Sequence, residues 1–98
     1  MKIVINRCFG GFSLSEEAVE YLGLERSHSF ICRDDPKLVK CVETLGSKRA
    51  SGTCANLVIV EIPDETNYGI EEYDGVETVV NEDYRDKFYI QYKEVKSK

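Results

Sequence analysis

The sequence predicts a small α+β domain, in which two helices pack against a mixed sheet of four to five strands. Three observations predict it: an apolar run that opens the chain, two segments with helix end signals, and a tight-turn signal between β-prone runs. With 98 residues, 42% of them hydrophobic, the chain can build one core and has no room for a second. We therefore expect a single domain, residues 1–98, with elements in the order β-α-(β)-α-β-β-β.

The first expected strand is Ile3–Ile5, which is apolar at every position, as is typical of a strand buried inside a sheet. Gly10–Gly11 follows and permits a sharp turn, because glycine reaches backbone angles that other residues avoid. A helix is expected next. Either Ser13 or Ser15 can cap its N-terminus, and Gly23 is a natural end.

The second expected helix has the clearest end signals. Asp35 is a good N-cap, Pro36 suits the first helical position, and Gly46 stands where a C-terminal glycine belongs. Before this helix, Phe30–Cys32 is a candidate short strand. After it, the polar and basic segment Ser47–Gly52 is expected to form an exposed, mobile loop.

The second half of the chain is β-prone. Leu57–Val60 is a β-branched run and is expected to form a central strand. Tyr68–Tyr73 and Val76–Val80 flank Asp74–Gly75, a dipeptide that strongly favours a two-residue hairpin turn. Apolar residues alternate with others over Phe88–Lys93, which predicts a last strand.

The net charge of −5 is unevenly distributed along the chain. Between Ala50 and Asp86 there are ten acidic residues and a single basic one, Arg85. Such a field repels nucleic acid and attracts basic surfaces, so we expect no nucleic-acid partner. The apolar run near the N-terminus is too short for a signal-peptide core or a membrane span. We therefore expect a cytoplasmic protein without a membrane partner.

The four cysteines are expected to be reduced thiols in that compartment. Cys8, Cys32, Cys41 and Cys54 lie 24, 9 and 13 positions apart, and structural zinc sites usually need closely spaced pairs. We expect neither a metal nor a cofactor. A nucleophilic Cys8 with His28 as its base is the enzymatic alternative, although buried structural thiols are commoner.

The loop between the first strand and the first helix is a candidate ligand site. Free backbone amides at a glycine turn before a helix can hold an anion, and Arg7 could add a contact. The candidate residues are Asn6, Arg7, Gly10, Gly11, Ser13 and Ser15. The spacing matches no known phosphate-binding fingerprint. In the alternative interpretation the glycines only turn the chain, while Phe9 and Phe12 pack on the core.

The acidic hairpin is a candidate partner site. Tyrosines are good interface anchors, and acidic groups steer basic partners toward a surface. The candidate residues are Tyr68, Glu71, Glu72, Tyr73, Asp74 and Glu77. In the alternative interpretation this is a solvated strand face whose tyrosines cover the core.

Several segments resemble a family of small bacteriophage and prophage proteins that has no established activity. Lys2–Ser15 is similar to the opening of that family. Asp34–Val39, Val60–Asp64 and Ile70–Gly75 are similar to its later motifs. The resemblance implies an accessory protein that acts inside an infected or lysogenic bacterium. Phage proteins of this size often bind and disable a host factor, including a defence system.

We therefore expect a non-enzymatic protein that binds a bacterial host protein through its acidic hairpin. A binder of a nucleotide or phosphorylated metabolite that uses the loop from Asn6 to Ser15 is the alternative, and a cysteine-based enzyme comes third. The sequence leaves the oligomeric state open.

Overall fold

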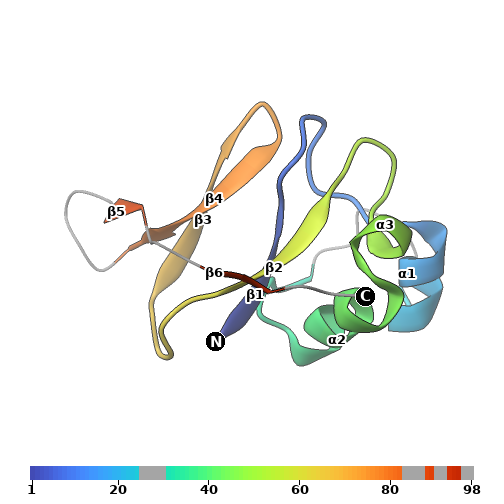
Figure 1. The fold of residues 1–98 in the computed structure, drawn as a ribbon, viewed down its shortest axis with the longest axis horizontal. Helices are drawn as coiled ribbons and strands as arrows, with labels where there is room; N and C mark the ends of the chain where they lie inside the picture. The colour runs from blue at the N-terminus through green and yellow to red at the C-terminus, as the bar shows by residue number, and fades with distance from the viewer. Residues whose placement is uncertain (25–30, 83–87, 90–92, 96–98) are drawn as a thin grey trace.

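The structure, a computed structural model, describes residues 1–24, 31–82, 88–89 and 93–95. Its elements in chain order are β1 (Lys2–Asn6), α1 (Glu16–Leu22), α2 (Pro36–Leu45), α3 (Ser47–Ala50), β2 (Leu57–Glu61), β3 (Tyr68–Tyr73), β4 (Val76–Asn81), β5 (Phe88–Tyr89) and β6 (Lys93–Val95). The predicted α+β class is confirmed. The expected single mixed sheet with two helices is not what the described chain forms: there are three helices, and the described strands form two antiparallel three-stranded sheets, in the orders β1-β2-β6 and β3-β4-β5, because the β3–β4 hairpin packs on a face of the first sheet and does not pair with its edge. Figure 1 shows the helices on one side of the first sheet and the β3–β4 hairpin on the other.

The first sheet is buried on both faces. Val4 and Ile59 pair across β1 and β2 and face the helices, where they pack with residues such as Leu38. Ile3 and Val60 pair in the same ladder but face the hairpin, where they belong to the second core cluster. Successive side chains of a strand point to opposite faces, so two apolar faces require an unbroken apolar run. β2 lies between β1 and β6, as predicted for a central strand.

Both predicted helices are confirmed with their end signals. Ser15 caps α1: its Oγ accepts the amide of Ala18 at 3.0 Å, and Gly23 ends the helix in the left-handed conformation. Asp35 caps α2 by accepting the amide of Lys37 at 2.8 Å. The buried face of α2 consists of Leu38, Val39, Cys41, Val42 and Leu45.

Two predictions for the segments between α1 and β2 are wrong. Ser47–Ala50 forms the short helix α3 and not an exposed loop, because Ala50 is fully buried in the helix-side core. Lys48 and Arg49 are on the solvent side of this helix, and their polarity is the reason that the sequence predicted an exposed loop. Ile31 and Cys32 are not in a strand, while Phe30 lies outside the described residues.

The predicted hairpin is confirmed. β3 and β4 pair without interruption from Tyr68 opposite Asn81 to Tyr73 opposite Val76. Asp74 and Gly75 form the turn with φ angles of 50° and 90°, as a two-residue hairpin turn requires. The single last strand expected over Phe88–Lys93 is divided: Phe88–Tyr89 extends the hairpin sheet, and Lys93–Val95 pairs with β2. Residues 90–92 lie outside the described residues.

The hairpin turn packs directly on the glycine loop. The amide of Gly10 approaches the carbonyl oxygen of Asp74 at 3.4 Å. A Cβ atom added to Gly75 would lie 2.3 Å from the nitrogen of Gly11 and 2.6 Å from that of Gly10. Backbone therefore packs on backbone here, and this contact needs glycine at position 75.

Substitution of Gly75 should measure this close approach. We expect Gly75→Ala to destabilise the protein by several kcal/mol, since strain at positive φ and displacement of the loop add together. Gly23→Ala is the matched control: its φ is also positive, at 69°, but no atom lies within 4 Å of an added Cβ. That variant should lose only about 1 kcal/mol. Urea unfolding measures both, and equal losses would show that the contact is dispensable.

Candidate functional site

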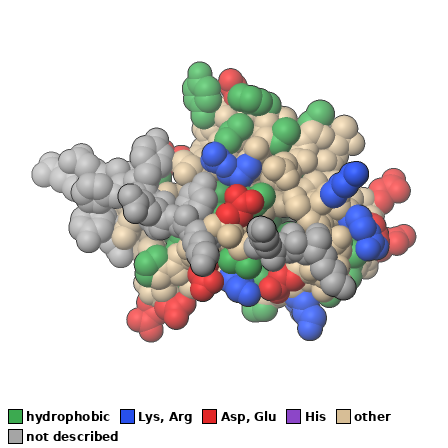
Figure 2. Space-filling model, viewed as in Figure 1, with side chains coloured by type: hydrophobic (Ala, Val, Ile, Leu, Met, Phe, Trp, Pro, Cys, Tyr) green, Lys and Arg blue, Asp and Glu red, His purple; other side chains and the backbone are tan. Residues whose placement is uncertain are grey.

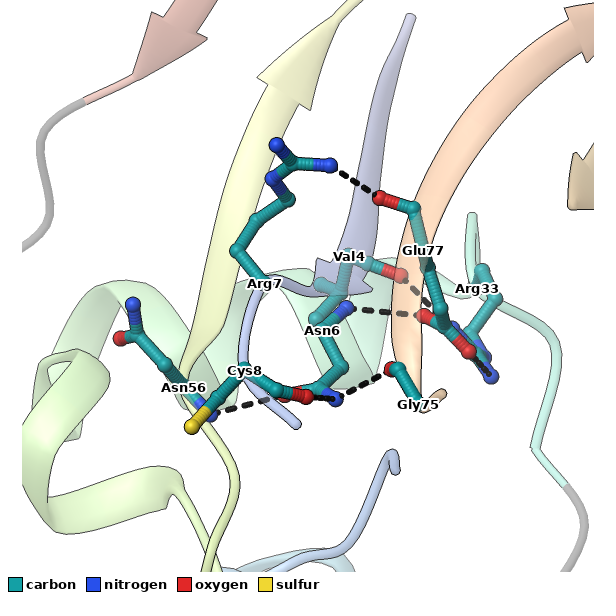
Figure 3. A network of polar contacts seen from close by, with 8 residues as sticks. All are labelled: Val4, Asn6, Arg7, Cys8, Arg33, Asn56, Gly75 and Glu77. Atoms are coloured by element: carbon teal, nitrogen blue, oxygen red, sulfur yellow. Dashed lines mark hydrogen bonds and ion pairs between the residues drawn. The ribbon is translucent and has the colours of Figure 1, made fainter. Parts of the chain in front are cut away.

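A buried carboxylate lies at the centre of the polar network between the two sheets. Glu77 of β4 is only 5% exposed. Its Oε1 accepts the backbone amide of Asn6 at 2.8 Å, and the guanidinium of Arg33 binds both carboxylate oxygens, with Nη2 at 2.8 Å from Oε2 (Figure 3). A buried charge is tolerated when it is paired and hydrogen-bonded in this way. The network therefore joins β1, β4 and the segment before α2.

The same pair closes the free edge of β1. The backbone groups of Val4 and Asn6 point away from β2. The amide of Val4 donates to the carbonyl of Arg33 at 2.9 Å, and Nη1 of Arg33 lies 3.4 Å from the carbonyl oxygen of Val4. The amide of Asn6 is taken by Glu77. Arg33 and Glu77 thus occupy the positions that a neighbouring strand would have filled.

Asn6 is the second buried polar residue of the network, and its side chain is fully engaged. It donates to the carbonyls of Cys8 at 2.8 Å and Gly75 at 2.7 Å, and it accepts the amide of Asn56 at 2.8 Å. These bonds hold the glycine loop, the hairpin turn and the start of β2 together (Figure 3). The residue is completely buried, so its role is to join these three segments.

The other predicted ligand residues are also engaged in the fold. Arg7 is exposed, but its guanidinium donates to the carbonyl of Glu77 at 2.6 Å. Gly75 packs against the Gly10 and Gly11 nitrogens, and the Gly10 amide is directed to the carbonyl of Asp74. The predicted cradle is therefore filled by the hairpin turn.

The two serines of the loop face the helices. Ser15 caps α1, and its hydroxyl donates to the carbonyl of Arg49 at 2.5 Å. The hydroxyl oxygen of Ser13 is buried against Gly52 and has no hydrogen-bond partner within the described part of the chain.

The structure divides the predicted partner residues into three groups by their exposure. Glu72, Tyr73 and Asp74 are exposed around the hairpin turn, with Tyr73 at 79%. Glu77 points inward and belongs to the buried network described above. Glu71 and Tyr68 lie between these extremes. Burial, and then the charge of Asp34, raise the pKa of Tyr68 to about 12.

Phe9 is a surface residue that the sequence did not reveal. Phe9 and Phe12 were both expected to cover the core, but Phe9 is 67% exposed beside the hairpin turn. Phe12 is half-buried under the guanidinium of Arg33, 3.8 Å from the ring centroid. Figure 2 shows hydrophobic side chains gathered at the end of the molecule where Figure 1 has the β3–β4 turn. We call Phe9, Glu72, Tyr73 and Asp74 the tip surface.

The cysteines do not form a site in the described part of the molecule. Cys41 is fully buried, and burial raises its pKa to about 11. Cys32 and Cys54 are exposed, and Cys8 is half-buried. His28 lies outside the described residues, so its relation to Cys8 stays a prediction. In the described ranges no three His, Cys, Asp or Glu side chains are grouped as metal ligands would be.

Comparison with protein-family models, curated proteins and solved structures finds no match to this chain. Among the helices that the structure describes, none is long and apolar enough to cross a membrane.

The Arg33–Glu77 pair should be strongly coupled. Arg33→Met leaves a buried carboxylate without its cation and should cost about 3–5 kcal/mol of unfolding free energy. The double variant with Glu77→Gln should lose less than the sum of the single losses, because the uncompensated charge is gone. Arg49→Met in the exposed Glu17–Arg49 pair is the control and should barely move the urea midpoint. Additive losses at positions 33 and 77 would refute the coupling.

Thiol alkylation should separate the cysteines by burial and pKa. Iodoacetamide reacts with the thiolate, and raising a thiol pKa from 9.0 to about 11 lowers the thiolate fraction about 100-fold near pH 8. We expect Cys41 to be labelled at least that much more slowly in the native protein than in the urea-unfolded protein, as followed by peptide mass spectrometry, whereas exposed Cys54 should be labelled readily in both. Equal rates would contradict the burial of Cys41.

The same experiment tests the enzymatic alternative. A Cys8 that reacts no faster than free cysteine would remove the main support for a cysteine enzyme.

Proposed function

We propose that this chain is a non-enzymatic binding protein that attaches to a basic, partly apolar surface of a bacterial host protein through its tip surface. The observation that carries the proposal is the exposure of two large aromatic side chains at one end of the molecule. Phe9 is 67% and Tyr73 is 79% exposed. Exposed apolar groups that gather in one place are typical of interaction sites, and aromatic residues often dominate binding energy there.

The two aromatic residues are mounted on a rigid support. Phe9 precedes Gly10, whose amide meets the carbonyl of Asp74, and Tyr73 precedes Asp74. The side chain of Asn6 fastens both loops from below through Cys8 and Gly75. A surface that is already ordered loses less entropy on binding, so its contacts contribute more to affinity.

The charge around the aromatic residues indicates the partner. Glu72 and Asp74 are exposed on either side of Tyr73 in the chain, within the acidic part of the sequence. Carboxylates at the rim of an interface steer basic partners and repel acidic ones. The resemblance to phage and prophage proteins suggests that the partner is a cytoplasmic protein of the bacterial host.

The small-ligand alternative lacks comparable support. Its amide cradle is filled by Gly75, and the polar atoms of Asn6 and Ser15 are used within the fold. An enzyme is supported only by the presence of Cys8, and His28, its candidate base, lies outside the described residues.

The double variant Phe9→Ala/Tyr73→Ala tests the proposal. Tagged wild-type protein is used to capture partners from bacterial lysate, and proteins retained by both wild type and variant are discounted as background. We expect a specific partner whose purified form binds the double variant at least about tenfold more weakly, since two aromatic anchors are lost.

Tyr21→Ala is the matched control, because Tyr21 is 44% exposed on α1, away from the tip surface. It should bind the purified partner like wild type. Because all three side chains are exposed, none of the substitutions should affect folding, which thermal unfolding will check. If wild type and the Phe9/Tyr73 variant retain the same proteins with the same affinity, the tip surface is not the binding site.

A further inference from the structure

β3 lies at an edge of its sheet. The order β3-β4-β5 leaves one side of β3 without a neighbouring strand among the described residues. Alternate residues of a strand direct their backbone groups to opposite edges. The amide of Glu82 bonds the carbonyl of Asn67 at 2.8 Å, which fixes the alternation along the hairpin. The N–H and C=O groups of Tyr68, Ile70 and Glu72 therefore point to the open edge.

The protection that this strand carries against pairing is the negative charge of Glu71 and Glu72. Proteins blunt open edges with charged side chains, proline, bulges or very short strands. β3 has six residues, contains neither proline nor lysine, and pairs with β4 in unbroken register. The contrast within the same molecule is sharp, because the edge of β1 is closed by Arg33 and Glu77. In the described chain, no backbone hydrogen bond reaches the outward groups of Tyr68, Ile70 or Glu72.

The charges beside the edge select its occupant. Glu71 and Glu72 lie on β3 itself, and Asp74 follows at the turn. A second copy of β3 aligned against the first would bring these glutamates together, and like charges on adjacent strands are destabilising. An extended segment with lysine or arginine side chains would meet opposite charges instead. At one end of the edge, exposed Tyr73 offers an apolar contact.

We infer that the open edge of β3 is a strand-addition site for an extended basic segment of the partner protein. The segment would pair with the outward backbone groups of Ile70 and Glu72, and its cationic side chains would lie beside Glu71 on one face of the sheet or beside Glu72 on the other. Main-chain hydrogen bonds supply affinity in this binding mode, and side chains supply specificity. The inference rests on the proposed binding function and specifies how the partner is held.

Three synthetic peptides test the inference with the unmodified protein. The first alternates lysine and valine over eight residues, the second has glutamate in place of lysine, and the third is the lysine peptide N-methylated at every residue, which blocks both of its edges. Amide chemical shifts and hydrogen exchange are followed by NMR. The lysine peptide should shift the amides of Ile70 and Glu72 and slow their exchange. The glutamate peptide should not bind, and N-methylation should weaken binding roughly tenfold or more, because blocked N–H groups cannot donate.

A variant pair tests the same edge in the protein. Glu72→Pro removes an outward N–H without touching the bonds to β4, whereas Glu72→Gln removes only the charge. Proline should abolish the peptide-induced shift at Ile70, and glutamine should weaken binding but keep the shift. Equal binding of the N-methylated and unmodified peptides, shifts confined to other strands, or concentration-dependent dimerisation through β3 would each overturn the inference.

The two proposals fail separately. If the peptides leave β3 unaffected while Phe9→Ala/Tyr73→Ala still loses the captured partner, the strand-addition site is wrong and the binding function stands. If that double variant keeps its partner, the proposed tip surface is wrong whatever the peptides do.

Discussion

The rest of this structure depends on the interactions of the Glu77 carboxylate. It is buried at the junction of the two sheets and is held by Arg33 and by the amide of Asn6. Removing a carboxylate from water is costly, so the three groups must be placed accurately for the junction to form. Once they are placed, β1 cannot slide against β4, and the glycine loop and hairpin turn are brought into contact. The tip surface owes its fixed shape to this buried pair.

Local chemistry made much of the fold predictable. Asp35, Pro36 and Gly46 define α2 through interactions within a few residues, and Asp74–Gly75 defines the hairpin in the same way. The apolar run of β2 reflects burial on both faces of one sheet. The short helix α3 was missed because its single buried residue, Ala50, carries little weight beside Lys48 and Arg49.

The site was less predictable, because its contacts join distant parts of the chain. Asn6 and Glu77 are 71 residues apart, and nothing near Glu77 in the sequence distinguishes it from Glu71 or Glu72. Glu72 is its direct pairing partner on the hairpin, but only Glu77, on β4, reaches Arg33 and the amide of Asn6. Phe9 and Phe12 likewise look equivalent in the sequence, and the difference arises because Arg33 covers one ring and leaves the other exposed. The prediction that Gly10–Gly11 turns the chain is confirmed, but the sequence could not show that Gly75 packs against this turn.

The closed edge of β1 also has a consequence for synthesis of the chain. Asn6 of β1 is synthesised 71 residues before Glu77. β2, Arg33 and the helices can assemble earlier, but the amide of Asn6 has no partner until the hairpin arrives. During that interval the nascent chain presents a hydrophobic strand with an incomplete edge, a state that promotes aggregation. The β3–β4 hairpin thus acts as a cover for β1.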